Sequence, residues 1–99
     1  MIKENEKGKK RRKEERISVA LPMNLGNTQY VTHDISPSGV YFEAEESFDV
    51  GGRINFVVEF INSVGSLKLK CHGEIVRVEN HNGKKGVAVR IVESVMESA

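Results

Sequence analysis

Two arginines near the N-terminus have a spacing suited to binding one planar, anionic ligand. Arg12 and Arg16 lie four residues apart in a polar segment. This spacing puts both side chains on the same side of an extended chain or of a helical turn. A guanidinium bonds bidentately to phosphate oxygens or to the O6 and N7 atoms of guanine, and its flat face stacks on a base. The pair therefore predicts contact with a nucleotide-like ligand.

A second group, Asp34, Ser36 and Gly39, follows about eighteen residues later in the run Asp-Ile-Ser-Pro-Ser-Gly. A carboxylate such as that of Asp34 accepts hydrogen bonds from the N1–H and N2–H₂ groups of guanine, and the Ser36 hydroxyl can donate to a phosphate. Gly39 permits close backbone approach. The alternative interpretation is that Asp34 and Ser36 only satisfy the backbone of their own turn.

The elements that must position these residues are strands. Apolar side chains recur with period two in six runs, namely residues 17–25, 29–35, 40–45, 53–61, 67–79 and 86–92, and turn signals such as Asn82-Gly83 separate the runs. In the fifth run the parity of the apolar positions changes near Gly73, which predicts a bulge or a bend. Residues 36–39 fit a type I turn. We expect an all-β, antiparallel domain closed into a six-stranded barrel, because closure removes exposed edges.

Charge and composition divide the chain. Residues 1–16 hold eight Lys or Arg against four Glu, whereas residues 17–99 hold seven against ten Asp or Glu. We expect residues 1–16 to be a basic arm that is flexible without ligand, because it has little apolar surface to bury. Residues 17–92 are expected to form the barrel. Residues 93–99 are expected to be a C-terminal tail with at most one helical turn. At 99 residues and 38% hydrophobic content the chain has one small core.

The two motifs, in this order and at this distance, resemble those of the PilZ domain family, the bacterial receptors for the second messenger cyclic di-GMP. The resemblance covers roughly residues 11–92 and matches Arg-x-x-x-Arg and Asp-x-Ser-x-x-Gly at every defining position. It implies a six-stranded antiparallel barrel, with Arg12 and Arg16 wrapping the ligand and with Asp34, Ser36 and Gly39 holding it. The chain is similar to stand-alone members of the family, which implies that it signals to a partner protein.

Arg11 directly precedes the first motif. Because a third guanidinium could stack on a second, intercalated ligand molecule, we expect two cyclic di-GMP per chain. The hypothesis is that the ligand neutralises the arginines and orders the arm across the barrel, creating a composite surface for the partner protein.

Other functions are less well supported by the sequence. No Ser-His-Asp or Cys-His arrangement has supporting context, and the histidines lack the spacing of metal ligands, so we expect neither an enzyme nor a metal or cofactor site. No run of eighteen apolar residues is present, and we expect a cytoplasmic protein without membrane insertion. Two alternatives stay open: a PilZ-fold adaptor that binds no nucleotide, and non-specific binding of nucleic acid through the basic arm.

Overall fold

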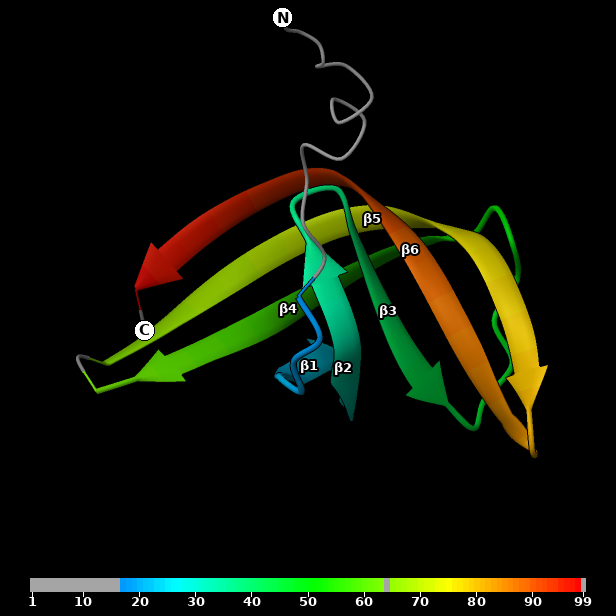
Figure 1. Ribbon diagram of the computed structural model, residues 1–99. Coiled ribbons are helices and arrows are strands. Elements are labelled where there is room, and N and C mark those ends of the chain that lie inside the picture. The colour runs from blue at the N-terminus through cyan, green and yellow to red at the C-terminus, as the bar shows by residue number, and fades with distance from the viewer. Residues whose placement is uncertain (1–16, 64, 99) are drawn as a thin grey trace, which may run out of the picture.

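The described residues form a closed antiparallel barrel. The structure is a computed structural model, and it describes residues 17–63 and 65–98 of the chain. Its strands close in the order β1-β2-β3-β6-β5-β4, as Figure 1 shows. This confirms the predicted all-β fold. The strand bounds are β1 Pro22–Leu25, β2 Thr28–Ser36, β3 Gly39–Ala44, β4 Arg53–Asn62, β5 Gly65–His81 and β6 Lys84–Ser98.

The barrel core follows the predicted alternation. In β3, Val40, Phe42 and Ala44 all point inward and are buried. Phe42 lies at the centre of an aromatic cluster, with its ring centroid 5.1 Å from that of Tyr30 and 5.7 Å from that of Phe48. Facing strands add further buried side chains, namely Met23, Phe56, Val58, Val87 and Val89.

The hairpin predicted at Asn82-Gly83 is confirmed. His81 pairs with Lys84 across it, so the loop has two residues. Asn82 has φ 49° and Gly83 has φ 85°. Two successive positive φ values are typical of a type I′ turn, whose twist matches that of the flanking strands.

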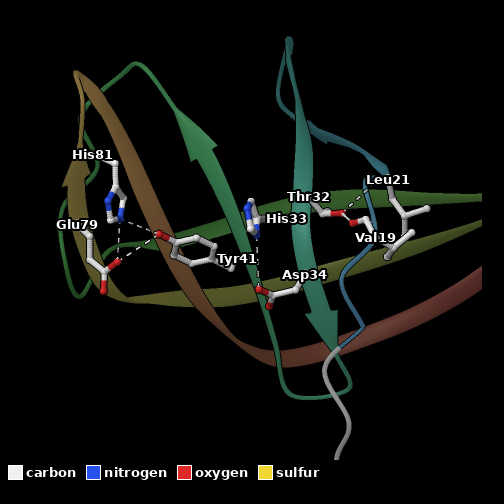
Figure 2. Close-up of polar contacts among 8 residues, drawn as sticks. All are labelled: Val19, Leu21, Thr32, His33, Asp34, Tyr41, Glu79 and His81. Atoms are coloured by element: carbon white, nitrogen blue, oxygen red, sulfur yellow. Dashed lines mark hydrogen bonds and ion pairs between the residues drawn. The ribbon is translucent and has the colours of Figure 1, made fainter.

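The first strand is shorter than predicted. The sequence predicts a strand over residues 17–25, whereas β1 begins at Pro22, which has no N–H to donate to a ladder. Residues 17–21 are instead bound along β2, where the Thr32 hydroxyl donates to the Val19 carbonyl at 2.6 Å and accepts from the Leu21 N–H at 2.9 Å (Figure 2). A side chain thus replaces part of the expected backbone ladder.

The start of the described chain is fixed next to the second motif. The Ile17 N–H donates to the Ile35 carbonyl at 2.8 Å, and the Ile35 N–H donates to the Ile17 carbonyl at 3.0 Å. Ile35 lies between Asp34 and Ser36. The residue that follows Arg16 is therefore held beside the Asp-x-Ser-x-x-Gly run.

The predicted tail at residues 93–99, with its helical turn, is wrong for the part that the structure describes. β6 continues to Ser98 and pairs with β5 throughout, ending with Ser98 opposite Leu67. Val92 is an extra residue, since Ile91 pairs with Gly73 and Glu93 pairs with His72. This bulge interrupts the apolar alternation after Ile91, so the period-two pattern in the sequence ends there although the strand continues.

The pairing of β5 with β6 has two register shifts, where the sequence predicted one bulge in β5 near Gly73. The first shift lies at this position, but its extra residue is Val92 of β6, so the predicted bulge in β5 at Gly73 is wrong. A Cβ at Gly73 would lie 2.6 Å from Val89 Cγ1 and 2.8 Å from the Arg90 carbonyl oxygen, so glycine is required. The inward parity, however, continues through Gly73 to Ile75. It changes at a second bulge, where Val76 is the extra residue between Ile75, opposite Val89, and Arg77, opposite Ala88.

Candidate ligand-binding groove

A groove of about 550 Å³ crosses the outer face of four neighbouring strands. β2 contributes one wall, β3 and β6 form the middle, and β5 contributes the opposite wall. The groove is lined by His33, Asp34, Ser38, Gly39, Tyr41, Val76, Arg77, Ala88, Val89 and Arg90. It therefore combines one carboxylate, two guanidinium groups, an imidazole and a phenol over a floor of small and aliphatic residues.

A β-bulge turns Asp34 toward this groove. Thr32 pairs with Phe42 and Asp34 pairs with Tyr41, so His33 is an extra residue in β2. Thr32 is buried, and in a regular strand the residue two positions later would point inward as well. The bulge reverses that parity, and Asp34 lines the groove with its Oδ2 3.9 Å from His33 Nδ1. Bulges that re-aim a side chain are common beside functional sites.

A second bulge does the same for Arg77 on the opposite wall. Ile75 is only 2% exposed, so in a regular strand Arg77 would also face the barrel interior. The extra residue, Val76, is 46% exposed, and both Val76 and Arg77 line the groove. Each wall is thus set by one extra residue.

Tyr41 lies between the walls and is held by β5. Its hydroxyl donates to Glu79 Oε1 at 3.3 Å and lies 3.4 Å from His81 Nε2, as Figure 2 shows. To reach Glu79 the Tyr41 side chain crosses Gly86 of β6, where any Cβ would overlap the Tyr41 hydroxyl. Burial and the nearby Glu79 charge raise the pKa of Tyr41, so it keeps its proton at neutral pH.

Both guanidinium groups of the groove are paired with carboxylates. Arg77 Nε lies 2.7 Å from Glu79 Oε2, and Arg90 Nη2 lies 2.7 Å from Glu74 Oε1. The hydrogen bond with His81, together with the charge of Arg77, lowers the pKa of Glu79. The carboxylate is therefore ionised at neutral pH and fixes the direction of the Arg77 side chain.

The structure brings two of the predicted site residues into the groove. Asp34 and Gly39 line it. Ser36 does not line the groove: it is 6% exposed and pairs with Gly39 across the tight turn. Arg11, Arg12 and Arg16 lie outside the described residues.

The sequence predicted none of the other lining residues. His33, Tyr41, Val76, Arg77 and Arg90 were not predicted to belong to the site. One signal was present: Ile75 and Val76 are adjacent aliphatic residues in a run that otherwise alternates, as happens when a bulge adds one residue to a strand. Among the residues that the structure describes, no three His, Cys, Asp or Glu side chains group as metal ligands, and no helix is long and apolar enough to cross a membrane.

Comparison with known proteins identifies both the sequence family and the fold. The sequence profile of the PilZ domain matches residues 10–98. A similar solved structure is that of the Bacillus subtilis inhibitor of motility (MotI/DgrA), with a TM-score of 0.76 and 16% sequence identity. The match covers 86% of this chain and 44% of that one, so this chain spans less than half the length of its structural neighbour. No curated protein matches the sequence.

Proposed function

The chain belongs to the PilZ domain family, a family of binding and adaptor domains rather than enzymes, and we propose from this premise that it is a cyclic di-GMP receptor. The groove over β2, β3, β6 and β5 is the proposed binding surface. The observation that carries the proposal is the placement of Asp34 and Gly39, two defining residues of the second motif, in one groove that also holds two guanidinium groups.

The groove matches the chemistry of a guanine nucleotide. Asp34 accepts from the N1–H and N2–H₂ groups of a guanine base. Gly39, without a side chain, leaves room for the ligand close to the backbone of β3. Arg90 supplies guanidinium donors for phosphates, and Arg77 adds a second guanidinium group on the opposite wall. Ser36 has an indirect role in this proposal, since it is buried in the turn that carries Gly39.

The arm supplies the remaining contacts in this proposal. Ile17 is bound to Ile35, one residue from Asp34, and consecutive Cα atoms lie about 3.8 Å apart. The Arg-x-x-x-Arg motif therefore joins the barrel next to the groove. We propose that Arg12 and Arg16 bind guanine and phosphate groups, that Arg11 stacks on a second cyclic di-GMP, and that the covered groove is recognised by a partner protein.

Non-specific binding of nucleic acid is the weaker candidate. Base stacking along a strand needs a row of exposed aromatic side chains. In the described residues, Phe42 and Phe56 are buried in the core, and Phe60 packs against it. Residues 17–99 also carry more Asp and Glu than Lys and Arg, which disfavours long phosphate backbones.

Replacing Asp34 with alanine is expected to weaken cyclic di-GMP binding about tenfold, because a base N–H group loses a charged acceptor inside the groove. Isothermal titration measures the change, and Asp49→Ala is the matched control, since Asp49 is exposed and does not line the groove. Equal affinities for the parent, Asp34→Ala and Asp49→Ala proteins, all folded by circular dichroism, would remove Asp34 from the site.

A further inference from the structure

Arg77 occupies the groove wall opposite Asp34 and belongs to neither sequence motif. The bulge at Val76 is the reason that it faces outward at all. This bulge disrupts the regular pairing of β5 and exposes an arginine in the groove. Bulges of this kind are common beside functional sites. Arg77 is therefore the groove residue whose position most needs an explanation.

Its side chain is held in place before any ligand arrives. Glu79 accepts from Arg77 Nε at 2.7 Å, and the guanidinium carbon lies 5.9 Å from the centroid of the Tyr41 ring. Tyr41 is itself bonded to Glu79 and crosses β6 above Gly86. Figure 2 shows Tyr41 pointing toward Glu79 and His81. Glu79 and Tyr41 therefore restrict the Arg77 side chain before binding, which reduces the conformational entropy lost when Arg77 binds a ligand.

The remaining hydrogen-bond donors of Arg77 suit one kind of base edge. Its bond to Glu79 uses Nε–H, whereas four of the five guanidinium donors belong to the two Nη atoms. Paired Nη–H donors match the O6 and N7 acceptors of guanine. They do not match adenine, which presents an N6–H₂ donor in place of O6.

The opposite walls can reach one base. β2 and β5 are three strand spacings apart, about 14 Å before curvature. An aspartate, a guanine and an extended arginine can together bridge this span across the small side chain of Ala88 on β6. In that arrangement Asp34 takes the N1–H edge and Arg77 takes the O6 and N7 edge.

We propose that Arg77 is a further ligand-binding residue, which reads the O6 and N7 atoms of a guanine base and selects guanine over adenine nucleotides. This inference rests on the proposed function, because it assigns a second contact within the same groove. Glu79 and Tyr41 are positioning residues that act through Arg77.

The test compares cyclic di-GMP with cyclic di-AMP in titrations of the parent, Arg77→Ala, Arg77→Lys and Arg53→Ala proteins. Arg53→Ala is the control, because Arg53 is an exposed arginine on β4 outside the groove. We expect Arg77→Ala to weaken cyclic di-GMP binding about tenfold and to reduce the preference over cyclic di-AMP by a similar factor. Arg77→Lys, which keeps the charge and the aliphatic stem, should lose the same preference, whereas Arg53→Ala should match the parent.

Two results would overturn the assignment while leaving the receptor function intact. In the first, the Arg77 variants bind cyclic di-GMP as tightly and selectively as the parent. In the second, the variants lose affinity for cyclic di-GMP and cyclic di-AMP by the same factor, which would indicate a phosphate contact. A folded parent protein that binds no cyclic di-GMP would instead remove the proposed function, and the Arg77 assignment with it. Thermal unfolding of each variant shows whether the fold is kept.

Discussion

Replacing Arg16 with alanine is expected to weaken cyclic di-GMP binding ten- to a hundredfold. Arg16 is the second arginine of the first motif and directly precedes Ile17, which is bound beside Asp34 through Ile35. Loss of a charged hydrogen-bonding group costs about 1.5–3 kcal/mol, which corresponds to that range of affinity. Isothermal titration of the parent and variant proteins measures the effect.

The arm offers a matched control for this prediction. Lys13→Ala removes one positive charge from the same segment without touching either motif arginine. We expect its affinity to lie within about threefold of the parent, since a charge that makes no direct contact with the ligand contributes little. Arg16→Lys should fall between the two, because an ammonium cannot form the bidentate fork. If Arg16→Ala binds as tightly as Lys13→Ala, the arm is not part of the site.

Replacing Phe42 with alanine is expected to lower the free energy of unfolding by about 3–5 kcal/mol. Phe42 is fully buried in β3, one position from Tyr41, and contacts the rings of Tyr30 and Phe48. Because small domains are stable by only about 5–15 kcal/mol, this loss is a large fraction of the total. Urea unfolding followed by circular dichroism measures it.

Phe48→Ala is the control for the core prediction. Phe48 belongs to the same aromatic cluster but is only partly buried, so its truncation should cost clearly less than that of Phe42. Equal losses for the two variants would show that the cluster, rather than the depth of Phe42, sets the stability of the barrel.

The strands and the core could be predicted because their signals are local and repeated. Val40, Phe42 and Ala44 alternate with polar residues and are all buried. Asn82-Gly83 specifies its hairpin through backbone conformation alone. In contrast, the anchoring of residues 17–21 by the Thr32 hydroxyl is a contact between distant residues, and no periodicity in the sequence reports it.

The binding groove could be predicted only in part, because two β-bulges decide which side chains of β2 and β5 face it. The motif identified Asp34 and Gly39, but regular alternation from Thr32 would have turned Asp34 inward. Arg77 and the strand beyond Val92 were missed for the same reason, since one extra residue shifts every later side chain to the other face. One extra residue is hard to detect in the sequence, yet in the sheet it decides which face the following side chains occupy.

Titration of the full chain with cyclic di-GMP is the decisive experiment, because the proposed function depends on binding in the groove that contains Asp34. We expect saturable binding, two ligand molecules per chain, and no comparable binding of GTP. A stoichiometry of one would remove only the stacking role of Arg11. A flat titration of a folded sample would contradict the receptor function and leave a ligand-independent adaptor as the better description.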